Sequence, residues 1–212
     1  MNNYYGEFAA LGTSVVWTFT ALCFEYAAKR IGTIGLNILR LFVALVIYTI
    51  MGIILRGEVI PLNAGGPAWF WLSLSGLVGF VFGDVFLFQA YIYIGARMTQ
   101  VVFVSSPIIT AILGYFVFGE KIAPLGILGM LIVIAAIIFV VLERRQGQGG
   151  TGGNTGKTEN RTKGIIFAVL AALGQSGGLI LSKIGAPSSD PMAATHIRVI
   201  AGLAGFANWF GI

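Results

Sequence analysis

The chain has 212 residues, of which 57% are hydrophobic and only 10% are charged, and its mean hydropathy is +0.90. This composition excludes a water-soluble globular domain, because too few polar residues are present to cover its surface. A net charge of +5 would favour nucleic-acid binding in a soluble protein. Here the basic residues gather between apolar runs, where they set membrane topology, and no nucleic-acid partner is expected.

Apolar runs long enough to cross a bilayer follow one another along the chain. A helix needs about 20 mostly apolar residues to cross roughly 30 Å of hydrocarbon. Seven runs approach or exceed this length, the last being the weakest: 8–28, 34–55, 68–94, 99–118, 125–142, 165–184 and 192–212. The sequence therefore predicts an all-α polytopic protein that is surrounded by the lipid bilayer and spans the cell membrane several times.

A polar segment, 143–164, separates the first five runs from the last two. It is rich in Gly, Thr, Asn and Gln, and it is predicted to be a flexible linker. Residues 8–22 resemble 167–181 across this linker, and the segment around Arg40 resembles the one around Arg198. The matched segments indicate an internal duplication, as many transporter folds contain.

The duplication predicts how the chain is divided. Residues 1–142 would form a first five-helix repeat, and residues 165–212 would form the start of a second one. A chain that stops inside an apolar run at 212 would then lack about three helices. The alternative is a complete seven-helix protein.

One stretch, from Gly83 to Glu120, resembles a known family. It contains an Ile-Gly-Ala turn at 94–96, a proline in mid-run at Pro107 and a Gly-Glu ending at 119–120. These features are similar to the third and fourth helices of the EamA-like family of the drug/metabolite transporter superfamily. The resemblance implies a ten-helix carrier of two inverted five-helix repeats, of which this chain holds about seven helices.

Asp84 lies near the middle of the third run, where a charge costs about 2.5 to 3.5 kcal/mol on insertion scales. Such a residue marks a path for a solute or a proton; the alternative is an acid held between helices for packing. Helical spacing places Tyr91 on the face of Asp84. Three glycines, Gly76, Gly79 and Gly83, lie about a quarter turn away, where a neighbouring helix is expected to approach closely.

Pro107 interrupts the fourth run in mid-membrane. It removes one backbone donor and frees the carbonyl of Phe103, so we expect a kinked helix whose free carbonyl faces protein or a cavity. Thr110 shares a face with Ser106 and Thr99 near this kink. These hydroxyls either line a cavity or form ordinary bonds between helices.

Three further charged residues are candidates for ion pairs. Glu25 and Arg40 lie at similar depth on consecutive helices that turn at 31–33, so the sequence predicts a structural pair between them. The alternative is that Arg40 receives an anionic group of the substrate. Arg198 would play the same part in the second repeat.

Trp17 and Gln175 occupy equivalent places in the two repeats, and equivalent positions face each other across the path of a pseudo-symmetric carrier. The alternatives are packing for Trp17 and a bond between helices for Gln175. We therefore expect a midplane cavity bordered by Asp84, Trp17, Pro107 and Gln175.

An enzymatic hypothesis begins from Gly174–Gly178, which matches G-x-S-x-G around Ser176. His196 and Asp84 could complete a Ser-His-Asp set for an intramembrane serine hydrolase. That motif works on a strand-to-helix turn, whereas this one lies in an apolar helical run, so no catalytic residue is expected. One cysteine and one histidine cannot form a Cys/His metal cluster, and neither a metal nor a cofactor is expected.

Together, the residues and the family resemblance predict a secondary transporter of a small metabolite or drug-like solute that works by alternating access. No P-loop pattern is present, so its energy would come from protons or an exchanged solute. A non-transporting membrane scaffold is the alternative. Counting basic residues places the linker in the cytoplasm, whereas the family resemblance implies that it lies outside; we favour the family arrangement, because the counts are equal without the linker.

Overall fold

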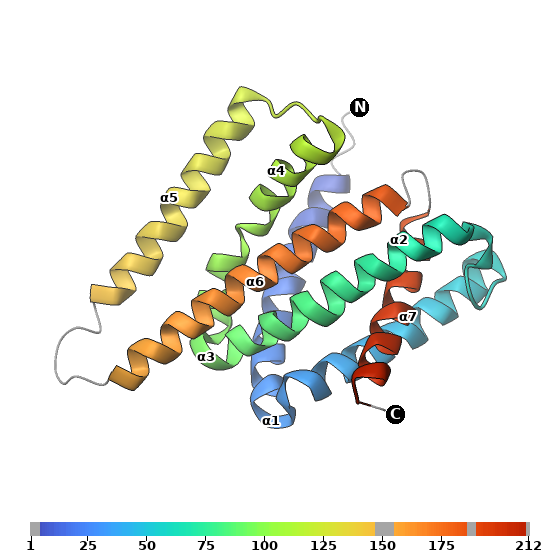
Figure 1. Cartoon of the computed structure of the whole chain (residues 1–212), viewed down its shortest axis with the longest axis horizontal. Coiled ribbons are helices and arrows are strands. Elements are labelled where there is room, and N and C mark those ends of the chain that lie inside the picture. Colours follow the sequence, from blue (N-terminus) through green and yellow to red (C-terminus); the bar gives the residue numbers. More distant parts are fainter. Residues whose placement is uncertain (1–4, 147–154, 186–189, 211–212) are drawn as a thin grey trace.

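The computed structural model describes residues 5–146, 155–185 and 190–210, and regular structure in these ranges is helical. The elements are α1 (Tyr5–Arg56), a 3-10 turn η1 (Leu62–Ala64), α2 (Gly66–Gly76), a π-helical segment η2 (Leu77–Gly83), α3 (Asp84–Phe103), α4 (Ser106–Phe118), α5 (Pro124–Gln146), α6 (Thr155–Gly185) and α7 (Pro191–Phe210). The predicted apolar runs map onto these helices in order (Figure 1).

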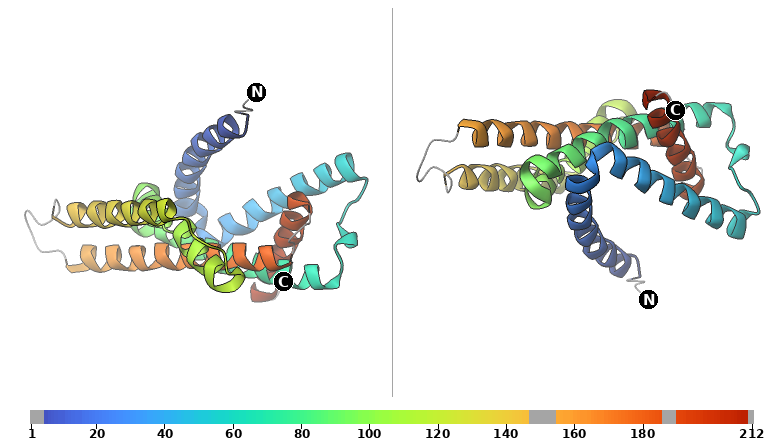
Figure 2. Two further views of the ribbon diagram at one scale, coloured as in Figure 1. Left: turned by 90° about the horizontal axis from the view of Figure 1, so that it is seen from above. Right: turned by 90° about the horizontal axis from the view of Figure 1, so that it is seen from below.

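Two of the long helices change direction at a glycine. Gly32 in α1 has a φ of 77° and Gly95 in α3 has a φ of 76°. This left-handed region costs other residues roughly 1 to 2 kcal/mol, which is why glycine stands at both turns. The first half of α1 consequently points away from the other helices, while its second half runs along them (Figure 2). Both turns were predicted, at 31–33 and at 94–96.

A two-residue turn interrupts the helix at the predicted proline kink. Helix α3 ends at Phe103 and α4 begins at Ser106, with Pro107 in the first turn of the new helix. A proline is well tolerated there, because the first N–H groups of a helix have no partner within it. Val104 and Ser105 between them keep right-handed helical backbone angles, so α3 and α4 follow each other as the two arms of the expected kink.

Helix α6 lies at the centre of the packing, against α2, η2, α3 and α4 (Figure 1). Glycines on both sides allow this approach: a Cβ atom added at Gly174 would lie 2.7 Å from the Cα of Gly83, and one at Gly178 would lie 3.0 Å from the Cα of Gly79. The hydroxyl of Ser75 donates to the carbonyl of Gly178 at 2.6 Å. The close approach predicted for the glycines of the third run is thus confirmed.

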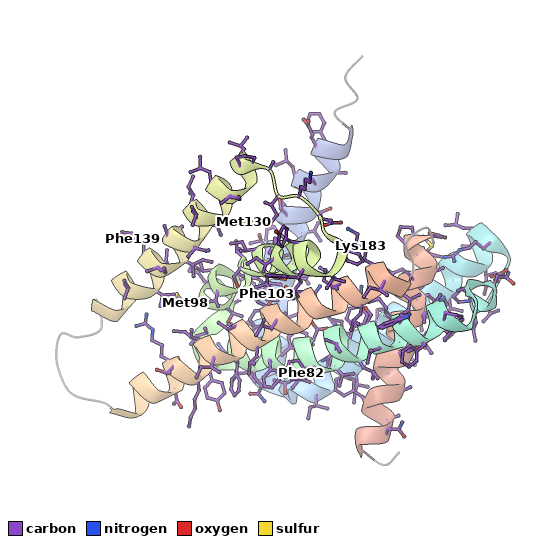
Figure 3. All side chains as sticks on the ribbon, turned by 45° about the horizontal axis from the view of Figure 1, so that its top comes forward. Phe82, Met98, Phe103, Met130, Phe139 and Lys183 are labelled. Atoms are coloured by element: carbon purple, nitrogen blue, oxygen red, sulfur yellow. The ribbon has the colours of Figure 1, made fainter. Side chains whose placement is uncertain are left out.

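The outer helices expose apolar side chains, as expected of a protein in lipid. Phe139 on α5 is 67% exposed and projects away from the neighbouring helices (Figure 3). Within the described part of the chain, four helices are long and apolar enough to cross a membrane: Gly6–Arg56, Gly66–Phe103, Pro124–Leu142 and Asn160–Gly185. Helix α7, predicted as the weakest span, is not among them.

The predicted linker is shorter than the polar composition suggested. Helix α5 reaches Gln146 and α6 begins at Thr155, so both ends of the 143–164 segment are helical. Its middle, 147–154, lies outside the described residues. A polar composition predicts that a segment is exposed to water, but it does not exclude a helix. A membrane-spanning helix can continue beyond its apolar part into the aqueous phase.

Candidate functional site

An ion pair between Arg40 and Asp84 occupies the interior, next to the π-helical segment. Asp84 follows η2 directly and is 6% exposed, and its Oδ2 accepts from Nη2 of Arg40 on α1. The same Nη2 lies 3.3 Å from Oδ1 of Asn37, whose Nδ2 donates to the carbonyl oxygen of Phe80 at 3.1 Å. Helix α1 is therefore bound to η2 by an amide and to the first residue of α3 by a charge. Turns of π-helix such as η2 are frequent at functional sites.

Glu25 has different partners from the one predicted for it. It pairs with Lys29 one turn later, and its Oε2 accepts from the backbone N–H of Ala96 at 2.7 Å. The break at Gly95 makes Ala96 a new helix start, where N–H groups lack partners and a negative charge is favoured. The predicted Glu25–Arg40 pair is thus corrected: Glu25 caps the second half of α3, and Arg40 binds Asp84.

A second arginine, Arg198 on α7, approaches the same place from the other side. Its Cζ lies 4.7 Å from the ring centroid of Phe80, and the Cζ of Arg40 lies 5.6 Å from that centroid. The charge of Asp84 acts on both guanidinium groups. We call Arg40, Asp84 and Arg198 the buried charge cluster.

The buried charge cluster holds one more positive charge than negative charge. Arg198 is 8% exposed, and its Nε and Nη2 atoms are buried without a hydrogen-bond partner among the described residues. Within the same ranges, the ion pair of Asp84 is the one with Arg40. A buried charge without a partner is costly, so Arg198 is the residue of this cluster that calls for an explanation.

Arg198 also lines a cavity of about 690 Å³ between α4, α6 and α7. Pro107 and Thr110 contribute from α4, so three of the predicted site residues meet there. The rim includes Glu120 and Lys183, which form an exposed ion pair; Lys183 lies at the end of α6 (Figure 3). The Gly-Glu ending at 119–120 thus contacts α6 through Glu120.

The other predicted residues lie in separate groups. Trp17 donates from Nε1 to Oε1 of Gln100 at 3.4 Å, and Gln100 donates from Nε2 to the hydroxyl of Tyr91 at 2.7 Å. Gln175 lies against the glycines of η2, with its Oε1 3.9 Å from a Cβ position at Gly79. The α4–α6–α7 cavity is therefore not bordered by Asp84, Trp17 or Gln175 as expected, and Pro107 alone of that set lines it.

The serine, histidine and aspartate of the enzymatic hypothesis each have other partners. The Oγ of Ser176 lies inside α6, 2.7 Å from the carbonyl oxygen of Ala172 and 3.1 Å from the Oγ of Ser106. His196 bonds through Nε2 to the hydroxyl of Thr49 at 3.3 Å, and Asp84 binds Arg40. Each of the three side chains therefore has its own partner in the structure.

Sequence reasoning missed three residues that contact the predicted site residues. Asn37 stands one turn before Arg40 in the second apolar run, and Gln100 is the lone amide of the fourth run, so polarity inside a span was an available signal for both. Phe80 gave no signal, because one phenylalanine among many in an apolar run says nothing about which cations lie over its ring.

A family model described as the EamA-like transporter family matches residues 4–142. The chain belongs to this EamA-like transporter family. The match covers α1 to α5 and includes Arg40, Asp84 and Pro107, whereas Arg198 lies beyond it. Family membership and several long apolar helices identify a multi-pass membrane protein of a transporter family.

Two curated relatives each match about two thirds of the EamA-like chain. A chloroplastic WAT1-related protein of Arabidopsis thaliana is 28% identical over 142 residues, which are 67% of this chain and 33% of that protein. An uncharacterized transporter of Synechocystis sp. is 28% identical over 152 residues, which are 69% of this chain and 46% of that protein. The chain thus matches less than half the length of these relatives. No solved structure matches it.

Proposed function

We propose that this EamA-like protein is a secondary carrier that moves a small metabolite or drug-like solute across the cell membrane by alternating access. The observation that carries the proposal is the α4–α6–α7 cavity, which leads from the exposed Glu120–Lys183 pair to the buried Arg198. A volume of about 690 Å³ is suited to a small solute, since ligand pockets typically measure roughly 300 to 1,000 Å³.

The two ion pairs beside this path differ in the energy needed to open them. Glu120 and Lys183 are both about half exposed, and such surface pairs contribute only about 0 to 1 kcal/mol. The pair of Arg40 and Asp84 is buried, and breaking such a pair by removing one partner costs about 3 to 5 kcal/mol. We propose that the exposed pair opens readily during transport, whereas the pair of Arg40 and Asp84 opens only when Asp84 is protonated.

The division into repeats is part of the proposal. Residues 1–142 would form one five-helix unit, and residues 165–210 would form the first two helices of a second, inverted unit. Under this arrangement Arg198 is the counterpart of Arg40, and Gln175 is the counterpart of Trp17. Transport would occur as the two units rock about a site between them.

Energy would be supplied by protons or by an exchanged solute, and Asp84 is the proposed proton carrier. Protonation would remove its charge and release Arg40 from the pair. The Asp84→Asn variant mimics that neutral state. We expect it to abolish solute accumulation driven by a pH gradient while retaining solute exchange; equal loss of both, in a correctly folded variant, would contradict proton carriage by Asp84.

Flux through reconstituted protein tests the function itself. Vesicles containing the intact protein are loaded with a cell metabolite extract, and the solutes that leave are identified by mass spectrometry. We expect a small set of solutes to leave faster than from protein-free vesicles, and Ser176→Ala to leave that flux unchanged. If folded protein releases nothing beyond the protein-free control, the carrier function is wrong.

A further inference from the structure

The two partnerless nitrogen atoms of Arg198 face the η2 segment. Nη2 lies 3.1 Å from the position that a Cβ atom would take at Gly79, and Cζ lies 4.7 Å from the ring centroid of Phe80. Nε and Nη2 are both buried, and neither Gly79 nor Phe80 lines the α4–α6–α7 cavity. These two nitrogens are therefore closed to a solute in the cavity, and a partner for them has to come from the protein itself.

Asp84 is the acid that can supply this partner. Its charge already acts on Arg198, although its hydrogen bond goes to Arg40. A guanidinium keeps its charge at any pH that a cell reaches, so Arg198 cannot relieve the cost of burial by losing its proton. Among the described residues, the other acids with an ion pair or a side-chain hydrogen bond are engaged elsewhere: Glu25 with Lys29, Glu58 with Asn63, Glu120 with Lys183 and Asp190 with Arg56.

The π-helical register of η2 places Asp84 close to the guanidinium of Arg198. The backbone N–H of Asp84 bonds to the carbonyl of Gly79, five residues earlier, so Asp84 lies one turn along the helix from the residue against which Arg198 packs. In an α-helix the same N–H would bond to the carbonyl of Phe80, four residues earlier. Here Nδ2 of Asn37 donates to that carbonyl at 3.1 Å, and this bond favours the π-helical register. Asp84 thus has an arginine on either side of it.

The two arginines belong to different parts of the chain. Arg40 lies on α1 before the polar linker, and Arg198 lies on α7 after it. Among the described residues they are the charged groups that act on Asp84, Tyr91 on α3 is the other titratable group near it, and α6 presents the uncharged Gln175 at this level. An acid that leaves one arginine for the other therefore changes which part of the chain is bound to α3.

We infer that Asp84 exchanges Arg40 for Arg198 during the transport cycle, and that Arg198 is unpaired in the described state because it is the partner of Asp84 in the other state. The carboxyl group takes up a proton as it leaves Arg40 and gives that proton up as it binds Arg198, since a nearby cation favours the carboxylate. One proton is carried in each exchange. This inference rests on the proposed carrier function, because it names the step that couples the proton to the movement of the two units.

Labelling of a cysteine in the α4–α6–α7 cavity tests the exchange. Thr110→Cys, combined with Cys23→Ala, is reacted with N-ethylmaleimide in the intact reconstituted protein. The cavity is open in the described state, in which Asp84 binds Arg40. Arg40→Met leaves Arg198 as the cation for Asp84 and favours the other state, so we expect labelling to be slower by about 5-fold or more. Arg198→Met keeps Asp84 on Arg40, so labelling should be as fast as before or faster.

Lysine variants and a surface control accompany this experiment. Arg40→Lys and Arg198→Lys keep the charge but lose the fork of the guanidinium, so each should act in the same direction as its Met variant with a smaller effect. They take the place of a Met variant that does not fold. Arg97→Met, at an exposed arginine outside the cavity, is the matched control and should leave labelling unchanged. Slower labelling in Arg198→Met, or no slowing in Arg40→Met, would overturn the inference.

Thermal unfolding of the intact protein in non-ionic detergent gives a readout that is independent of flux. Arg198→Met should lower the unfolding temperature more in the Arg40→Met background than in the wild type, because Asp84 then loses its last cation. An equal shift in both backgrounds would overturn the exchange. Wild-type accumulation driven by a pH gradient in a folded Arg198→Met variant refutes the exchange alone, whereas the expected labelling without any flux refutes the carrier function and leaves the exchange.

Discussion

The buried charge cluster shows how three ionisable residues can share a site inside a membrane. Asp84 binds Arg40 directly and acts electrostatically on Arg198, and both cations lie over the ring of Phe80. A cation over an aromatic face gains about 0.5 to 2 kcal/mol, which offsets part of its desolvation. The acid is thus the group on which both arginines depend.

This dependence predicts an asymmetry between two substitutions. Asp84→Leu leaves the buried Arg198 and the half-buried Arg40 without an acid, so it should lower the free energy of unfolding by about 3 to 5 kcal/mol. Arg40→Met should cost less, because Asp84 then has Arg198 as its remaining cation. Reversible unfolding in mixed micelles measures both values.

Two comparisons make the asymmetry testable. The double variant Arg40→Met with Asp84→Leu should be more stable than Asp84→Leu alone, since it contains one fewer unpaired charge. Lys29→Met, which breaks an exposed pair with Glu25, should cost no more than about 1 kcal/mol. A larger loss for Arg40→Met than for Asp84→Leu would refute the shared-acid arrangement.

Glycines determine how the helices meet and where they turn. Gly79 and Gly83 on η2 face Gly178 and Gly174 on α6, so backbone packs on backbone at the centre of the fold. Such contacts between small residues drive helix association in lipid, where no hydrophobic effect acts between the helices. At Gly32 and Gly95 glycine has a different role, because a long helix changes direction there through a residue with positive φ.

Two alanine substitutions separate the role of a glycine in helix packing from its intrinsic effect on helix stability. Gly174→Ala places a methyl group 2.7 Å from the Cα of Gly83, and it should destabilise the protein by about 1 to 3 kcal/mol through overpacking. Gly129→Ala on α5 meets no atom within 4 Å and should be neutral or slightly stabilising. Thermal unfolding of the two variants compares them directly; equal effects would show that close packing at Gly174 is unimportant.

Contacts between the first five helices and the last two hold the described structure together. Helix α6 packs on α2, α3 and α4, while α7 packs on α1 and α2. The Arg56–Asp190 pair, with Nε and Oδ2 3.2 Å apart, joins the end of α1 to the start of α7. A carrier built this way needs some of these contacts to persist and others to change during transport.

A cross-link between α4 and α6 tests whether the contact between these two helices persists or changes during transport. The hydroxyls of Ser106 and Ser176 lie 3.1 Å apart, so cysteines at both positions, with Cys23 replaced by Ala, should form a disulfide on mild oxidation. The link should abolish flux reversibly if α4 moves against α6 to open the cavity. Single-cysteine variants are the controls, and failure to cross-link would refute the placement of α4 on α6.

Sequence alone was sufficient for features that depend on neighbouring residues. Apolar runs located the helices, because each span must be apolar over its own length, and Gly32, Gly95 and Pro107 marked where the helical path is interrupted. It also gave the family, whose match was later found over residues 4–142. Among the site residues, it identified Asp84, Arg40 and Arg198 as charges that a membrane interior does not tolerate without a reason.

Only the tertiary structure decided which of these charges meet. Sequence reasoning paired Arg40 with Glu25, whereas in the structure the break at Gly95 gives Glu25 the free N–H of Ala96. The partner of Arg40 is Asp84, 44 residues away along the chain. Hydropathy and spacing describe one helix at a time, whereas an ion pair depends on the rotation and depth of two helices, and those are set by packing.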